Sequence, residues 1–323
     1  DRRRAMQLRR TFSLTAVFLA CGLAFAARPA AAQPSQATQP SQPTQPAPRP
    51  PALEQVRGLG LDSLAGPLPV HYSASFRDRA AEVQSILREG ARFFADSLAL
   101  PTTVRVALLS QADWHRVSQV PYGVPYVQGG VVFIPASGDG VIVDDFLRLE
   151  ANASPAAHAK VAQTGLSFAQ NARRMTDLIG YHELGHGYVD AYGIRAHARW
   201  FNEFLATYMA YAYLHRMQPA VARGWEAMLQ AKLDAPAPAH TSLAAFDSLY
   251  IRVGPENYNW YQAAFALHAA EVFQAEGLGF LARVREAFPA VQGEARLDGE
   301  TVLARLEQIR PGFRAWADSL GGP

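Results

Sequence analysis

The sequence predicts an α+β fold, in which a small N-terminal sheet is followed by a mostly helical C-terminal subdomain. Two short runs rich in β-branched residues, at 102–109 and 130–135, are typical of strands. From about residue 155 the pattern is helical almost to the end of the chain, with interruptions at Gly and Pro residues. Because strands and helices are segregated along the chain, we expect one globule of the α+β class.

The first predicted element is an amphipathic helix at 74–98. Its apolar residues recur near helical spacing, at Phe76, Val83, Ile86, Leu87, Phe94 and Leu98. The two predicted strands follow this helix, and the long helical region comes after them. We place the division between the two subdomains near residue 193, where Gly193 interrupts the helical pattern.

Length and composition limit the class of protein. The chain has 323 residues, of which 49% are hydrophobic, and one cysteine. These values exclude a wholly disordered chain, a disulfide framework and a cysteine-built zinc module. Residues 1–52 hold seven Arg and one Asp, which leaves 23 basic and 27 acidic residues in the rest of the chain. Because the chain after residue 52 has a small net negative charge, it lacks the basic surface that binds DNA or RNA, and we expect no nucleic-acid partner.

Residues 1–32 have the pattern of an export signal with a short upstream extension. Arg9 and Arg10 precede an uncharged apolar run at 11–27, and small residues follow it up to Ala32. We therefore expect an exported protein in the periplasm, in the cell envelope or outside the cell. An uncleaved signal or a lipid anchor at Cys21 is the alternative, and either would be the only link to a membrane.

A Pro- and Gln-rich segment at 33–53 separates this signal from the folded region. Proline at this density favours extended backbone, so we expect a semi-rigid linker. The folded domain is then expected at 54–323.

The strongest chemical signal is the segment HELGH at 182–186. On a helix, positions i and i+4 share one face, so His182 and His186 can present two imidazole nitrogens to one metal ion. Glu183 would lie beside them as a general base for a water molecule. Two imidazoles with a carboxylate favour Zn²⁺ as the cofactor.

Glycine is frequent around this motif, at Gly180, Gly185 and Gly187. Each glycine costs a helix about 1 kcal/mol relative to alanine. We expect that their use is to let another backbone or a substrate approach closely; helix ends or packing notches are the alternative.

Three downstream residues are candidates for a third metal ligand: Asp190, His197 and Glu203. Asp190 lies one turn further along the same helix, where it would orient a ligand instead of binding the metal. Glu203 is the only charge in the apolar helix at 200–214, and a lone buried carboxylate is costly unless it is paired or bound to a cation. We therefore predict Glu203 as the ligand and Asn202 as a supporting residue; the alternative is a salt bridge from Glu203 to a nearby arginine, Arg195 or Arg199.

HELGH followed by Glu203 within WFNEFLA resembles the gluzincins, the thermolysin-like and aminopeptidase-N-like zinc peptidases. The resemblance implies a zincin-like fold and a peptidase activity, and Asp190 matches the thermolysin-like pattern. It also implies a tyrosine donor to the oxyanion of the intermediate, for which Tyr261 is the first candidate and Tyr258 the second. The aminopeptidase motif Gly-x-Met-Glu-Asn is absent from the sequence, which favours an endopeptidase.

The strand at 128–133 is a candidate for binding substrate. An edge strand that includes Gly129, Gly130 and Val131 would pair with an extended peptide through its main chain. The alternative is an ordinary hairpin strand with a Gly bulge.

Together these residues predict an exported zinc metallopeptidase with a peptide or protein as its substrate. His182, His186 and Glu203 would hold zinc, and Glu183 would move the proton. The alternative is a catalytically inactive, zinc-bearing envelope protein that binds peptide or glycan. The sequence predicts no particular oligomeric state.

Overall fold

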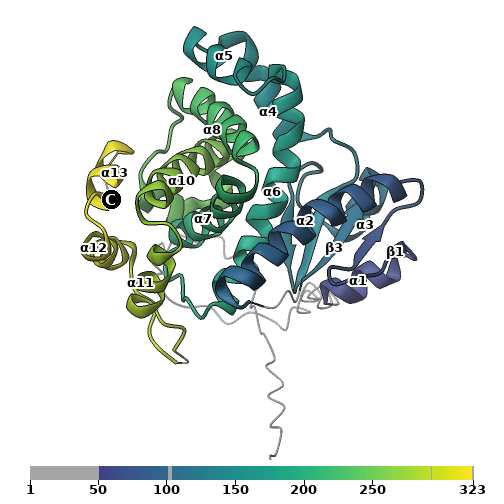
Figure 1. Cartoon of the computed structure of the whole chain (residues 1–323), viewed down its shortest axis with the longest axis horizontal. Coiled ribbons are helices and arrows are strands. Elements are labelled where there is room, and N and C mark those ends of the chain that lie inside the picture. The colour runs from purple at the N-terminus through teal and green to yellow at the C-terminus, as the bar shows by residue number, and fades with distance from the viewer. Residues whose placement is uncertain (1–50, 101–103, 292, 322–323) are drawn as a thin grey trace, which may run out of the picture. The chain divides into compact units, whose positions relative to one another are not determined.

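A computed structural model describes residues 51–100, 104–291 and 293–321 (Figure 1). The predicted export signal at 1–32, with Cys21, and most of the predicted linker lie outside the described residues. The compact unit begins at Ala52, the first residue of helix α1 (Ala52–Gly58). Ala52 is buried against the sheet, so the folded region starts two residues before the predicted boundary.

A five-stranded sheet lies in the N-terminal part of this unit. Its strand order is β1-β2-β3-β5-β4, in which β2, β3 and β5 run parallel while β1 and β4 are antiparallel edge strands. The strands are β1 (Asp62–Leu64), β2 (Val70–Tyr72), β3 (Arg105–Leu109), β4 (Tyr126–Gln128) and β5 (Val131–Pro135). β3 and β5 confirm the two predicted strands, apart from positions 102 and 103, which are not described. The other three strands have three residues each, too few for a periodic pattern.

Both faces of the sheet are covered by helices. Alternate residues of β3 and β5 face two different clusters: Val106 and Val132 pack into the main core, while Ala107 and Val131 pack with Trp114 of α3 (Gln111–Val117). Helix α2 (Arg77–Leu98), which confirms the predicted amphipathic helix, covers the main-core face. Because both faces are buried, β3 and β5 are apolar without alternation.

The rest of the unit is helical. Helix α6 (Phe168–Ala191) lies between the sheet with α2 on one side and the bundle of α7, α8 and α10 on the other (Figure 1). The remaining elements are α4 (Val141–Leu149), η1 (Glu150–Asn152), α5 (Pro155–Ala162), α7 (Arg199–Met217), α8 (Pro219–Asp234), α9 (Leu243–Leu249), η2 (Tyr250–Val253), α10 (Pro255–Glu276), α11 (Gly279–Ala287), α12 (Gly299–Ile309) and α13 (Phe313–Ser319). The structure is therefore mixed and mostly helical with one small sheet, which is compatible with the predicted α+β class.

One glycine sets the distance between α6 and α7. A Cβ atom on Gly185 would lie 2.4 Å from the carbonyl oxygen of Ala206, so only glycine permits this approach of the two backbones. Gly185 therefore has the use that the sequence predicts, whereas Gly180 and Gly187 lie against the side chains of Leu87 and Val104. The close approach at Gly185 brings the histidines of α6 within reach of side chains on α7.

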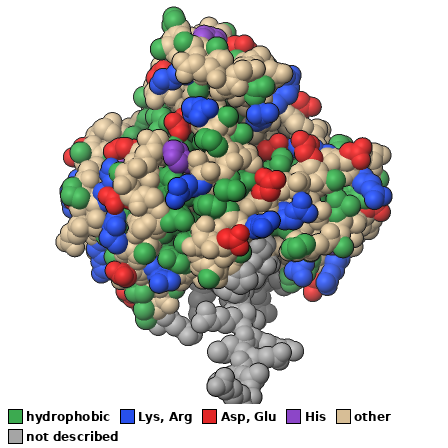
Figure 2. Space-filling view, viewed as in Figure 1, with side chains coloured by type: hydrophobic (Ala, Val, Ile, Leu, Met, Phe, Trp, Pro, Cys, Tyr) green, Lys and Arg blue, Asp and Glu red, His purple; other side chains and the backbone are tan. Residues whose placement is uncertain are grey.

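The surface of the unit carries charges of both signs. On the face shown in Figure 2, basic and acidic side chains are interspersed. Within the described ranges, no helix combines the length and the apolar character needed to cross a bilayer.

Candidate metal centre

The central helix α6 begins with a strong cap and carries the HELGH segment in its buried second half. The hydroxyl of Ser167 accepts the N–H of Gln170, and the side chain of Gln170 accepts the N–H of Ser167. His182 and Glu183 are each 7% exposed, so the motif lies in the interior. The rings of His182 and His186 lie side by side, with their centroids 4.8 Å apart. This is the i, i+4 geometry that the sequence predicts.

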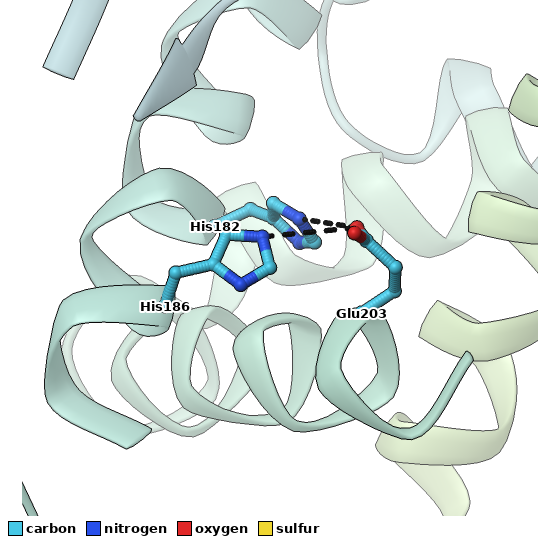
Figure 3. Close-up of side chains that lie close together, drawn as sticks. All are labelled: His182, His186 and Glu203. Atoms are coloured by element: carbon cyan, nitrogen blue, oxygen red, sulfur yellow. Dashed lines mark hydrogen bonds and ion pairs between the residues drawn. The ribbon is translucent and has the colours of Figure 1, made fainter. Parts of the chain in front are cut away.

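Glu203 of α7 faces both rings (Figure 3). Its Oε2 atom lies 3.1 Å from Nε2 of His182 and 3.7 Å from Nε2 of His186. One ligand atom from each of the three side chains lies within 4.8 Å of the other two. The structure therefore brings together the three residues predicted as metal ligands.

The two separations from Glu203 are close to those in a tetrahedral zinc site. Bonds of 2.0–2.1 Å in a tetrahedral arrangement place neighbouring ligand atoms about 3.3 Å apart. The distances from Glu203 to the two histidines lie on either side of this value. Glu203 is 2% exposed, and it forms no ion pair with Arg195 or Arg199 among the described residues. A buried acid facing two imidazole nitrogens is a donor set that suits a divalent cation.

The second nitrogen of each ring is held by α7. His182 Nδ1 lies 2.9 Å from the hydroxyl of Thr207, and His186 Nδ1 lies 3.1 Å from the side-chain amide of Asn202. Such outer contacts fix the orientation of each ring. Nε2 of His186 is a metal ligand in the tautomer that carries the proton on Nδ1, with the carbonyl oxygen of the Asn202 amide turned toward that proton. Asn202 takes the supporting position that the sequence predicts. Thr207 was not predicted, although it lies one turn after Glu203 on the same helix.

The carboxylate of Glu203 also has two partners from distant elements. Tyr250, the first residue of η2, donates its hydroxyl to Oε1 at 2.9 Å, and Gln262 of α10 donates its amide to Oε2 at 2.9 Å. Neither residue was predicted, because no local pattern links them to α7. Tyr250 has a φ of 50°, a conformation that is unfavourable for a residue with a side chain.

The protonation states suit metal binding. Burial opposes the charge of Glu203, but His186 and a hydrogen bond with His182 outweigh it and lower the pKa of Glu203 to about 2. Burial lowers the pKa of His186 to about 4, which leaves its lone pair free at neutral pH. For His182, burial is outweighed by the hydrogen bond with Glu203, so its pKa is raised. A cation at this position would replace the proton that Glu203 favours on His182.

The pKa of Glu183 is shifted in the opposite direction from that of Glu203. Burial, assisted by the charge of Glu203 and opposed by His182, raises the pKa of Glu183 to about 8. Its carboxylate also accepts a hydrogen bond from the backbone N–H of Val127, which lies on the edge strand β4. The acid is therefore poised to exchange a proton near neutral pH, beside the metal ligands and one strand of the sheet.

The two predicted tyrosines differ in position. Burial raises the pKa of Tyr258, and the nearby charges of Glu203 and Glu183 raise it further. The centroid of its ring is 5.9 Å from that of Tyr250. Tyr258 therefore lies near the metal centre. The structure does not bring Tyr261 there, because its hydroxyl is donated to the carbonyl of Ser242 at 2.8 Å.

Asp190 does not take its predicted place either. It is exposed at the end of α6, and in the described part of the chain no hydrogen bond joins its carboxylate to His182 or His186. The positions beside the two Nδ1 atoms are filled from α7. His197, the other candidate, is not part of the group formed by His182, His186 and Glu203, and its Nδ1 accepts the N–H of Leu297.

The strand predicted to bind substrate is not at the edge of the sheet. Gly129 and Gly130, with φ of 56° and 74°, form the turn between β4 and β5, and Val131 is buried in β5. β5 pairs with β3 on one side and with β4 on the other, so Val131 has no free edge. The edge strand next to Glu183 is β4, which was not predicted as a strand.

Comparisons of the chain with protein-family models, curated proteins and solved structures found no match.

Proposed function

We propose that this protein is an exported zinc-dependent peptidase of the gluzincin type, with a zincin-like fold. The observation that carries the proposal is the convergence of His182, His186 and Glu203, with Glu183 one residue from the first histidine. An i, i+4 pair of histidines and a buried acid on the next helix form the ligand set of a catalytic zinc with an open position. When bound, zinc would supply Lewis acidity to a water molecule or a carbonyl oxygen.

Glu183 is the proposed general base. Its buried carboxylate would take a proton from the attacking water and deliver it to the leaving amine. The raised pKa of about 8 indicates that the protein environment allows this carboxylate to hold a proton. The N–H of Val127 would keep it in place during the transfer.

Two features support a peptide as the substrate. The edge strand β4 lies next to Glu183, and its main-chain groups other than the N–H of Val127 could pair with an extended chain. The hydroxyl of Tyr258 is near Glu203 and Glu183, where it would donate to the developing oxyanion. Tyr250 would instead hold Glu203. With the Gly-x-Met-Glu-Asn clamp absent from the sequence, we propose an endopeptidase.

Replacement of Glu183 by Gln tests this proposal. We expect the variant to retain zinc but to lose about 10²–10⁴-fold in hydrolysis of a peptide library, the range for removal of a general base. Asp190→Asn is the matched control, because Asp190 is exposed on the same helix, and it should cleave normally. Normal cleavage by the Glu183→Gln variant would contradict the mechanism. Zinc binding without any cleavage by the unaltered protein would favour the inactive peptide- or glycan-binding alternative.

A further inference from the structure

A pocket of about 310 Å³ opens beside the metal centre. Its inner wall includes the ligand Glu203, with Asn202 and Tyr250, which contact His186 and Glu203 respectively. A group bound in this pocket would therefore lie next to the proposed reaction centre. The volume suits one amino-acid side chain or the end of a peptide and is at the low end for small-molecule sites.

The rest of the wall is basic. Arg195, Arg199 and Arg296 line the pocket, and they come from the segment before α7, from the first residue of α7 and from the segment before α12. Arg199 is four residues before Glu203, on the same face of α7. Its guanidinium lies 5.1 Å from the ring centroid of Tyr250, against the residue that holds Glu203.

Two of these guanidinium groups lack an acidic partner. Among the described residues, neither Arg199 nor Arg296 forms an ion pair; they donate to the main-chain carbonyls of Asp247 and His197. The carboxylate of Asp247 is engaged by the N–H groups of Arg199 and Trp200. Burial raises the pKa of Asp247 and the charges of both arginines oppose this shift, but neither arginine forms an ion pair with it, so each guanidinium keeps hydrogen-bond donors for a ligand.

Arg195 has only a weak acidic contact. It donates to the carbonyl of Val291 at 3.2 Å, and its guanidinium lies 3.9 Å from the carboxylate of Glu294. Glu294, Asp247 and Glu203 bring three carboxylates near the three arginines, so a divalent cation held by Glu203 would leave an excess of positive charge at this wall.

His197 adds a buried donor without an acceptor. The N–H of Leu297 is donated to Nδ1 of His197 at 3.0 Å, which leaves the ring proton on Nε2. His197 is 1% exposed, and its Nε2 has no hydrogen-bond partner; Glu294 is 4.0 Å away. Burial and then the charge of Arg195 lower the pKa of His197, in agreement with a positive field in this region.

We propose that this arginine pocket, lined by Arg195, Arg199 and Arg296, binds a carboxylate of the peptide substrate. The carboxylate would come from an Asp or Glu side chain near the scissile bond or from the free C-terminus of the peptide. The planar guanidinium fork matches the two oxygens of a carboxylate, and such charge-assisted hydrogen bonds are strong. This inference rests on the proposed peptidase function and adds the substrate class to it.

The test uses three fluorescent peptides that differ only in charge: one with an internal Glu and an amidated C-terminus, one with Gln and a free C-terminus, and one with Gln and an amidated C-terminus. Binding to the zinc-loaded Glu183→Gln protein is measured by fluorescence anisotropy, and kcat/KM is measured on the unaltered protein. We expect the peptide with the matching carboxylate to be bound and cleaved at least about 10-fold better than the neutral peptide, the effect of one or more charged hydrogen bonds. Preference for the first peptide identifies a side-chain carboxylate, and preference for the second identifies the C-terminus.

Arginine variants link the preference to the pocket. Arg199→Gln and Arg296→Gln should each reduce the preference about 10-fold, and Arg296→Glu should favour a peptide with Lys in place of Glu. Arg92→Gln, whose parent side chain is 84% exposed on α2, is the control and should change neither value. Arg296 is itself exposed, so its variants are expected to fold.

The outcomes separate this inference from the proposed function. Equal binding of all three peptides, or a preference that survives the arginine variants, would overturn the arginine pocket even if peptides are cleaved. Arginine-dependent binding without cleavage would support the pocket and overturn the peptidase.

Discussion

Two buried polar clusters in this protein differ in whether a lysine balances their carboxylate, and this difference distinguishes a structural ion pair from a candidate metal site. In the first, Lys232 of α8 lies 2.9 Å from the carboxylate of Asp145 on α4, and the amide of Asn259 on α10 donates to the same carboxylate at 2.9 Å. Opposite charges balance there, and the cluster holds three helices together. In the second, Glu203 faces two imidazole nitrogens, and no lysine or arginine in the described ranges forms an ion pair with it. A buried cluster that lacks only a cation is a candidate metal site.

The largest effect is expected at the unbalanced cluster. Glu203→Gln removes one of three ligands and the only ligand charge, so zinc affinity should fall by roughly three orders of magnitude, a share of the 10–16 kcal/mol typical of a full zinc site. Competition with a chromophoric chelator measures this affinity. Unchanged affinity would show that the ion, if bound, lies elsewhere.

The balanced cluster should respond in stability instead. Lys232→Met leaves the carboxylate of Asp145 buried without its main partner, so the free energy of unfolding should fall by about 3–5 kcal/mol. The double variant Asp145→Leu/Lys232→Met should recover much of this loss. Urea unfolding measures both values, and zinc affinity of the folded protein should not change. A loss of zinc in Lys232→Met would contradict the separation of the two clusters.

An outer contact of the metal centre should have a smaller effect. Thr207→Val removes the oxygen beside His182 Nδ1 while keeping the shape of the side chain. Loss of such a partner lowers metal affinity by about 10–100-fold. The same chelator competition measures it. An unchanged affinity would indicate that α6 alone orients the His182 ring.

The smallest effect concerns a buried histidine outside both clusters. His268 stacks on Trp316 at 4.4 Å, and burial lowers its pKa to about 4, with Glu271 opposing and Arg310 assisting. The unfolded chain therefore binds more protons between about pH 4 and pH 6.5, so this group makes the folded state less stable as pH falls through that range. His268→Gln should flatten this part of the stability profile, measured by urea unfolding in the presence of chelator. An equally steep profile would exclude His268 as its source.

The three residues of the candidate metal centre could be predicted because each belongs to a recognisable local pattern in the sequence. His182 and His186 share one helical face, and Glu203 is the only charge in an apolar helix. The hydrogen-bond partners of Glu203 belong to no such local pattern. Tyr250 and Gln262 reach Glu203 only through the packing of η2 and α10 against α7.

The errors have similar physical causes. The buried run of β5 could not reveal that it pairs on both sides, so Val131 was placed at an edge that belongs to β4. The three-residue strands are too short for a periodic signal. Tyr261 was predicted from the gluzincin resemblance, and Asp190 from its place on the helix as well as from that resemblance. The packing of this chain instead turns Tyr261 toward Ser242 and leaves Asp190 exposed.

Anomalous diffraction at the zinc absorption edge, from crystals of the protein purified without chelator, tests the central claim most directly. We predict one peak, about 2.0–2.1 Å from Nε2 of His182, from Nε2 of His186 and from a carboxylate oxygen of Glu203. Absence of a peak among these three side chains, or a peak only at another position, would contradict the account.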